Sequence, residues 1–290
     1  MSVADRDPQT QEALTRTETA RGQVSRSKGA MPLLSVEHLV KNFGPVRAVN
    51  DVSLDLFEGE VVGLVGDNGA GKSTLLSILT GYHHADSGVF RYRGEVVAHT
   101  SPSSSRRALK IEMIYQHLDL APDLPVWQNL FLAEERRKFK IFLDKRWMRQ
   151  RAAEVLGELG SKVKPDDLVG ALSGGEQQVV AISRALLFER DIVLMDEPTA
   201  AISLNKVRDV LDLIMRLRGL GKTVVLVSHR LEDILEVADR IVILRRGTIA
   251  QILHNDHQMS VSELARMMFE DVVHSGVGIS DGESVAEENR

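Results

Sequence analysis

A glycine-rich loop at residues 66–73 constrains this chain more than any other feature of its sequence. The loop reads GDNGAGKS, which matches the pattern G-x-x-x-x-G-K-[S/T], and it lies between an apolar run that predicts a buried strand and a predicted helix. Because glycine has no Cβ, such a loop can wrap a polyphosphate and direct its backbone N–H groups at it. We therefore expect Lys72 to reach the phosphate oxygens and Ser73 to hold Mg²⁺.

A second motif, IVLMDE at residues 192–197, supplies the carboxylates that such a site needs. Its four apolar residues predict a buried strand, and ligands of open α/β sheets gather beyond the carboxyl ends of strands. We expect Asp196 to act in the hydration shell of the metal and Glu197 to polarise the attacking water. A surface acidic pair at a strand end is the alternative, and the glycine-rich loop disfavours it.

A third motif, LSGGEQ at residues 172–177, precedes a run with helical apolar periodicity. Ser173 and Glu176 have the spacing of a capping box at the start of a helix. Two glycines in a first helical turn cost about 1 kcal/mol each relative to alanine, so capping alone does not explain them. They suit the close approach of an anion to exposed N–H groups.

Composition narrows the class of protein. The chain has 290 residues, 43% of them apolar and 27% charged, which is typical of globular proteins. Its net charge of −5 does not favour a protein devoted to nucleic acid. With no cysteine, any metal must be held by oxygen or imidazole. No apolar run reaches the roughly 18–20 residues that cross a bilayer.

The order of predicted elements indicates a doubly wound α/β fold. Alternating runs at residues 33–57 predict antiparallel strands, residues 124–159 predict a mostly helical stretch, and residues 240–253 predict a closing hairpin. Continuous apolar runs, which predict buried parallel strands, lie at residues 60–65, 111–116, 191–196 and 223–229.

Both ends of the chain are poor in apolar periodicity. Residues 1–30 mix charged and polar side chains, and residues 272–290 are rich in Gly, Ser and Glu. Such composition predicts a disordered N-terminal tail and a flexible C-terminal tail. The folded domain is then expected at residues 31–271.

With GDNGAGKST, Gln116, LSGGEQQ, LMDEPT and VSHR in this order, the chain resembles the ATP-binding cassette ATPases over residues 33–268. The resemblance implies an α/β P-loop NTPase fold with a mixed, mainly parallel core sheet, an N-terminal antiparallel β subdomain and a helical subdomain at about residues 117–190. It implies hydrolysis of ATP with Mg²⁺ as cofactor. The residues it places on the nucleotide are Phe43, Gly66, Asp67, Asn68, Gly69, Ala70, Gly71, Lys72, Ser73, Thr74, Ser173, Gly174, Gly175 and Glu176.

The resemblance also implies individual roles. Phe43 would stack on adenine and His229 would contact the γ-phosphate; considered alone, the two are more typical of strand packing and of a hydrogen-bonded structural histidine. Gln116 would touch Mg²⁺ and relay the state of a transporter. Ser173 and Gly175 would bind ATP held by the opposite protomer, so the chain is expected to form a homodimer or to pair with a related cassette.

One position departs from the family pattern. The family usually has an aspartate shortly after the threonine that follows the carboxylate pair, where this chain has Ser203. Because serine has no carboxylate, the resemblance does not extend to communication between the two sites through that aspartate. The sequence TAAI at residues 199–202 instead resembles the branch that serves simple-sugar importers.

That branch implies partners and a location. It predicts an ATPase subunit at the cytoplasmic face of the cell membrane, working with a separate integral-membrane permease and a solute-binding protein. The alternatives are an importer ATPase for another solute, or a soluble single-cassette ATPase acting on a ribosome- or DNA-associated complex. Residues 136–151 carry eight basic side chains, for which a solvated face near an anionic membrane is favoured over nucleic acid.

Overall fold

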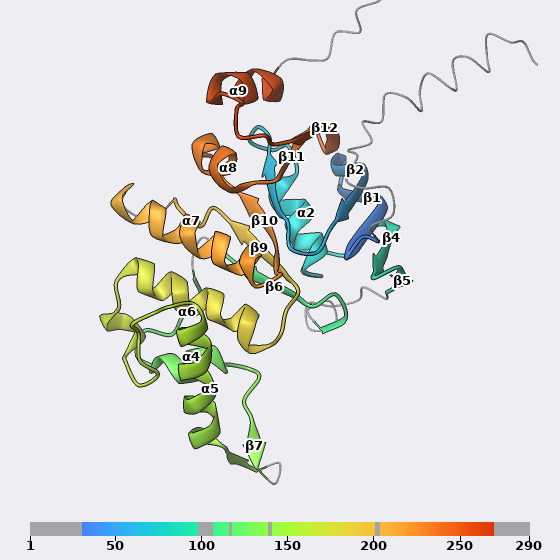
Figure 1. Ribbon diagram of the computed structural model, residues 1–290. Coiled ribbons are helices and arrows are strands. Elements are labelled where there is room, and N and C mark those ends of the chain that lie inside the picture. The colour runs from blue at the N-terminus through green and yellow to red at the C-terminus, as the bar shows by residue number, and fades with distance from the viewer. Residues whose placement is uncertain (1–30, 98–106, 116–117, 139–140, 201–203, 270–290) are drawn as a thin grey trace, which may run out of the picture.

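The computed structural model of the chain describes residues 31–97, 107–115, 118–138, 141–200 and 204–269 (Figure 1). The two expected tails, at residues 1–30 and 272–290, lie outside the described residues. Gln116 and Ser203 lie outside them as well. Among the described helices, none is both long enough and apolar enough to span a bilayer.

The N-terminal segment forms an antiparallel sheet, as its alternating pattern predicts. The sheet has the order β2-β1-β4-β5. Its longest strands, β1 (Leu34–Phe43) and β2 (Val46–Leu56), are joined by a tight turn at Gly44, where φ is +57°. The shorter strands are β4 (Ser87–Tyr92) and β5 (Glu95–Val96).

The core sheet has six strands in the order β12-β11-β3-β10-β9-β6. All neighbouring pairs are parallel except β11 with β12, which form the closing hairpin expected from the sequence. The strands are β3 (Val61–Val65), β6 (Ile111–Ile114), β9 (Ile192–Asp196), β10 (Thr223–Val227), β11 (Arg240–Arg245) and β12 (Thr248–His254).

Both faces of this sheet are covered, which explains the continuous apolar runs. Successive residues of β3 point to opposite faces, so Val61 and Val65 join one apolar cluster while Val62 and Leu64 join another. On the second face lie α2 (Lys72–Leu79) and the antiparallel sheet. On the first face lie α6 (Gly174–Leu187), α7 (Leu204–Gly219) and α8 (Leu231–Val237). The predicted α/β fold class is confirmed.

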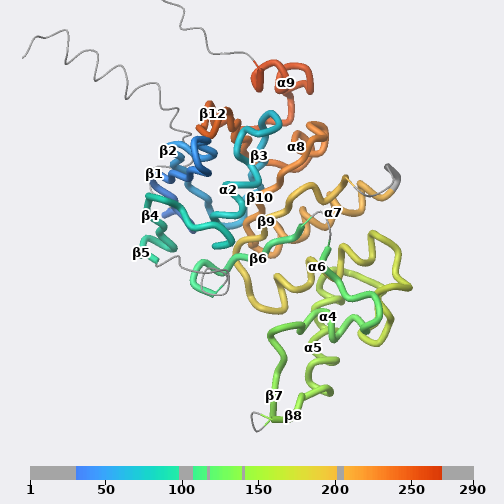
Figure 2. Tube along the Cα trace, turned by 180° about the vertical axis from the view of Figure 1, so that it is seen from behind, coloured from blue at the N-terminus to red at the C-terminus, as the bar shows by residue number. Residues whose placement is uncertain are grey.

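A helical region extends from the first face, and both views place it at the end of the molecule opposite the last helix, α9 (Val261–Phe269) (Figures 1 and 2). It contains α4 (Val126–Leu130), α5 (Lys145–Glu158) and the short 3-10 helix η1 (Val169–Ala171), packed with α6. These elements fall within residues 117–190, whose boundaries as a helical subdomain stay a prediction.

Residues 124–159 contain the helices α4 and α5, in line with the mostly helical prediction. Between these helices, β7 (Arg137–Lys138) and β8 (Phe142–Leu143) form a two-stranded antiparallel ribbon that the sequence did not indicate. Strands of two residues are too short to show an alternating pattern, so the sequence offered no signal for them.

Candidate active site

The glycine-rich loop joins the end of β3 to the start of α2, as its pattern predicts. The Lys72 side chain is buried and folds back over the loop, where its Nζ donates hydrogen bonds to the carbonyl oxygens of Gly66, at 2.8 Å, and Asp67, at 3.1 Å. Gly71 precedes the helix with φ at +105°, a left-handed conformation that glycine adopts readily. The ammonium group is thus held beside the first turn of α2.

Close backbone contacts explain two of the glycines. A Cβ on Gly66 would lie 2.2 Å from the carbonyl oxygen of Leu244, and one on Gly71 would lie 2.4 Å from that of Ala48. Neither oxygen can move without shifting a strand, since Leu244 belongs to β11 and Ala48 to β2. The loop is therefore wedged between the two sheets.

The ends of two parallel strands bring the carboxylates to the same place. Asp196 ends β9 and pairs with Val227 at the end of β10, and the Glu197 backbone N–H donates to the Val227 carbonyl at 2.9 Å. His229 follows β10, and its backbone N–H donates to Glu197 Oε2 at 3.1 Å. His229 Nε2 lies 3.3 Å from Glu197 Oε1.

Burial shifts the pKa values of Lys72, Asp196 and Glu197. Burial lowers the pKa of the Lys72 ammonium, against the attraction of Glu197 and Asp196. Burial raises the pKa of Asp196, against the effects of Lys72 and the Ser73 hydroxyl. Burial also raises the pKa of Glu197, against the hydrogen bond from the His229 backbone. Two desolvated carboxylates beside one ammonium favour the arrival of a cation.

Two observations test whether the chain can accept Mg²⁺ and a water nucleophile. Ser73 and Asp196 offer the oxygen ligands that Mg²⁺ prefers, and within the described residues no cluster of three His, Asp or Glu side chains could hold a metal alone. Mg²⁺ usually keeps several waters and binds through one or two protein oxygens together with substrate phosphates. In that same part of the chain, Glu197 Oε1 is buried and makes no hydrogen bond, although His229 Nε2 lies 3.3 Å away, so it can accept a hydrogen bond from a water.

These groups surround an open pocket of about 640 Å³. The predicted site residues that line it are Asn68, Gly69, Gly71, Lys72, Ser73, Thr74, Asp196, Glu197 and His229. It is lined as well by Val46, Arg47, Ala48, Val227 and Arg246. Gly66, Asp67 and Ala70 belong to the loop but do not line the pocket. The structure therefore brings together, in one chain, most of the residues that the loop and carboxylate motifs predict.

Phe43 lies beside this pocket rather than on its wall. It pairs with the wall residue Val46 across the β1–β2 turn and is 43% exposed. Its ring meets His83 edge to face at 5.1 Å, with Lys41 Nζ 5.5 Å from the ring centre. One face of an exposed aromatic ring at a pocket rim can stack on a planar ligand.

The pocket includes two arginines that the sequence analysis did not single out. Arg47 comes from the β1–β2 hairpin and Arg246 from the β11–β12 turn. The second turn is tied to the loop because the Gly247 N–H donates to the Ala70 carbonyl at 2.9 Å. The sequence identified that turn, but no local pattern connects it to a loop more than a hundred residues earlier.

A buried carboxylate behind the pocket was also missed. Asp233, in α8, accepts hydrogen bonds from Thr199 Oγ1 at 2.8 Å and from Arg230 Nε at 3.2 Å. Thr199 follows the carboxylate pair, and Arg230 follows His229. Asp233 therefore joins the two chain segments that leave the pocket.

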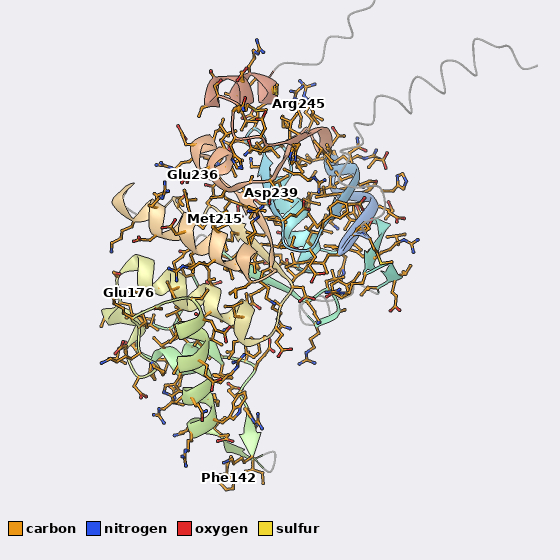
Figure 3. All side chains as sticks on the ribbon, in the orientation of Figure 1. Phe142, Glu176, Met215, Glu236, Asp239 and Arg245 are labelled. Atoms are coloured by element: carbon orange, nitrogen blue, oxygen red, sulfur yellow. The ribbon has the colours of Figure 1, made fainter. Side chains whose placement is uncertain are left out.

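The LSGGEQ motif at residues 172–177 lies away from the pocket. Ser173 precedes α6, and Glu176 Oε2 accepts hydrogen bonds from the Ser173 backbone N–H at 2.8 Å and hydroxyl at 2.7 Å, which lowers the pKa of Glu176. Ser173, Gly174, Gly175 and Glu176 do not line the pocket. Figure 3 shows Glu176 at the outer edge of the helical region. The structure therefore separates this motif from the other two within one chain.

Comparison with known proteins places the chain among transport cassettes. The family model described as ABC transporter matches residues 49–200. The xylose/arabinose import ATP-binding protein XylG of Sulfolobus acidocaldarius is 43% identical over 238 residues, which is 81% of this chain and 93% of that protein. The ribose import ATP-binding protein RbsA of Rhodococcus jostii is 39% identical over 249 residues, 86% of this chain but 48% of that protein.

The chain thus spans nearly all of XylG and about half the length of RbsA. Among solved structures, a nucleotide-free ATP-binding cassette from an ABC transporter superposes with a TM-score of 0.69 at 26% identity, covering 83% of this chain and 96% of that one. The dimeric bacterial ABC transporter cassette MJ0796 gives a TM-score of 0.63 at 25% identity, covering 76% and 98%. The chain belongs to the ABC transporter family, as one of its ATP-binding cassettes.

Proposed function

We propose that this cassette hydrolyses ATP to energise the import of a simple sugar through a separate integral-membrane permease. The observation that carries the proposal is the meeting of Lys72, Asp196, Glu197 and His229 around one open pocket. The names of XylG and RbsA, which are sugar import ATP-binding proteins, support a sugar as the solute.

The pocket residues have distinct roles in this proposal. Lys72 and the N–H groups of residues 68–73 bind the phosphates, Phe43 and the rim of the pocket hold the base, and Ser73, Asp196 and Gln116 hold Mg²⁺. Mg²⁺, when bound with ATP, neutralises charge on the phosphates. Glu197 orients and polarises the attacking water, with His229 beside it contacting the terminal phosphate.

Two cassettes complete each site in this scheme. Ser173, Gly174 and Gly175 do not line the pocket of their own chain, and the start of their helix suits an anion presented by another chain. We infer a homodimer, or a pair with a related cassette, in which ATP adds charge-assisted contacts across the interface. Loss of the terminal phosphate removes those contacts, so the protomers separate.

The same scheme implies further partners. A permease at the cytoplasmic face of the membrane receives the motion of the cassettes, and a solute-binding protein delivers the sugar. There are two rival functions: an ATPase that acts on a ribosome- or DNA-associated complex, and an ATPase that energises the import of another solute.

Transport by reconstituted vesicles tests the proposal. The chain is co-expressed with the permease that co-purifies with it, and ATP-dependent uptake of labelled pentoses and hexoses is measured, with Glu197→Gln as the inactive control. We expect uptake of one sugar that the variant abolishes. Recovery of ribosomal proteins or DNA-bound factors instead of a permease would replace the proposal with the rival, and uptake of a non-sugar solute alone would correct the substrate.

A further inference from the structure

The β7–β8 ribbon and the first turn of α5 form a tip that the nucleotide chemistry does not use. We define the basic tip as Arg137, Lys138, Ile141, Phe142, Leu143, Lys145 and Arg146. Figure 1 shows this ribbon at the far end of the helical region, and Figure 3 shows Phe142 pointing outward there. We propose that the basic tip binds the surface of an anionic phospholipid bilayer.

Its apolar side chains are exposed to a degree that packing does not explain. Ile141 is 73% exposed, Phe142 69% and Leu143 40%. Large apolar groups gathered on a protrusion mark a surface that is covered in the working state. At the depth of lipid headgroups, an Ile, a Phe and a Leu would be removed from water together.

The cations of the tip are available for an anionic partner. Arg137, Lys145 and Arg146 are exposed, and none has a carboxylate oxygen within 4.0 Å in the described part of the chain. Lys138 lies 3.4 Å from Asp144 and is still 61% exposed. Free positive charge beside exposed apolar groups is the chemistry of an anionic membrane interface.

Two arginines next to the basic tip, Arg136 and Arg149, are held by contacts within the protein. Arg136 stacks over the Trp147 ring at 4.1 Å, and Arg149 stacks over the Trp127 ring at 4.7 Å while pairing with Asp166 at 2.6 Å. These side chains hold the base of the tip together. Among the described residues, no aromatic ring or carboxylate holds Arg137, Lys145 or Arg146 in this way, whereas Lys138 is paired with Asp144.

Hydrogen bonds of Asp144 and the buried face of α5 fix the position of the basic tip. Asp144 Oδ1 accepts a hydrogen bond from the Trp147 N–H at 3.3 Å, and the Asp144 N–H donates to the Arg136 carbonyl at 2.9 Å. Met148, Ala152, Val155 and Leu156 fasten α5 in the core. Lipid is favoured over nucleic acid because two of the three exposed apolar side chains, Ile141 and Leu143, gain from apolar burial but offer no aromatic face for stacking on bases.

Vesicle co-sedimentation of the full chain tests the proposal. The probes are vesicles of phosphatidylcholine alone and vesicles that also contain phosphatidylglycerol. We expect binding to the anionic vesicles only, and Lys145→Gln/Arg146→Gln should weaken it about 25-fold, since each cation near such a surface is worth ~1 kcal/mol, or about fivefold. Phe142→Ser should weaken it by about tenfold or more through lost apolar burial.

The matched control is Lys162→Gln/Lys164→Gln, which removes the same charge from exposed lysines beyond the other end of α5. It should bind vesicles like the native chain, and all variants should keep native ATP turnover and melting temperature. Equal binding to neutral and anionic vesicles, or unchanged binding by both tip variants, would overturn the proposal. So would RNA binding that depends on Lys145 and Arg146 without vesicle binding.

The proposal is independent of the transported solute. If sugar uptake fails while vesicle binding depends on the tip, the proposed function is wrong and the tip assignment stands. If sugar uptake succeeds and vesicle binding is absent, the proposed function stands and the assignment of the tip is wrong.

Discussion

The pocket and the start of α6 are built in opposite ways. The pocket joins loops and strand ends from β3, β9, β10 and two hairpin turns, and its central groups are buried against one another. The start of α6 is local, since Ser173 and Glu176 satisfy each other within one helical turn at the surface. The first region needs the whole fold, whereas the second needs only three or four consecutive residues.

Their glycines show what this difference means. At Gly66 a Cβ would lie 2.2 Å from the Leu244 carbonyl oxygen, so the fold itself requires glycine. At Gly175 the nearest neighbour of an added Cβ is Lys206 Cδ at 3.9 Å, which is an ordinary contact. The described contacts of the chain therefore leave room for a side chain at position 175.

The largest effect is expected for Gly66→Ala. The added methyl group must displace β11 or the loop, so we expect the free energy of unfolding to fall by about 1–3 kcal/mol and ATP binding to be lost. Chemical denaturation and nucleotide titration measure the two effects. Gly157→Ala is the control, because nothing lies within 4 Å of its Cβ and alanine favours the α5 helix. Native ATP binding by Gly66→Ala would show that the close contact is not required.

Glu197→Gln should have the next largest effect. The amide keeps the shape of the side chain but cannot polarise water, so hydrolysis should fall about 10²–10⁴-fold while ATP binding persists. Phosphate release and nucleotide binding are measured in parallel, with Glu95→Gln, an exposed carboxylate on β5, as control. A sedimentation experiment with ATP should show the variant accumulating as a dimer. An unchanged turnover rate would remove Glu197 from the mechanism.

Gly175→Ala should distinguish the start of α6 from the pocket most clearly, because we expect it to lower turnover without lowering stability. We expect stability to stay level or to rise by up to about 1 kcal/mol, because alanine is the better helix former. Turnover should nevertheless fall about tenfold, the equivalent of ~1.4 kcal/mol at the transition state, as the methyl group obstructs nucleotide held by the partner. Melting temperature and turnover at several protein concentrations test this. If turnover is unaffected, the start of α6 is only a capped helix.

The smallest effect concerns the pH dependence of the unliganded chain. Burial raises the pKa of Asp196 in the folded state. Protonated Asp196 therefore contributes to the stability of the fold. This contribution is complete below the ordinary carboxyl pKa of about 4, and it is lost as the pH rises through the folded-state pKa. Asp196→Asn should therefore show a slightly higher melting temperature than the native chain at neutral pH, and the difference should vanish in acid. A lower melting temperature without ligand at neutral pH would mean that Asp196 is stabilised by its neighbours instead.

Much of the fold was predictable because its signals are local. The apolar runs of β3, β9 and β10 are continuous since both faces of the sheet are buried, and the alternation in β1 and β2 reflects a sheet with one exposed face. The glycine-rich loop and the carboxylate pair follow strands directly, so their place at one sheet edge could be inferred. The β7–β8 ribbon could not, because two residues carry no period.

Local patterns of residues were enough to identify the chemical groups at the strand ends and the motif that starts a capped helix, because both depend on neighbours within a few residues. The packing of distant segments places Arg246 and Arg47 on the same pocket, lets Asp233 join the segments behind it, and keeps Ser173 off its wall. These outcomes depend on strand order and on how one hairpin turn packs against a distant loop, and a linear pattern of residues contains neither.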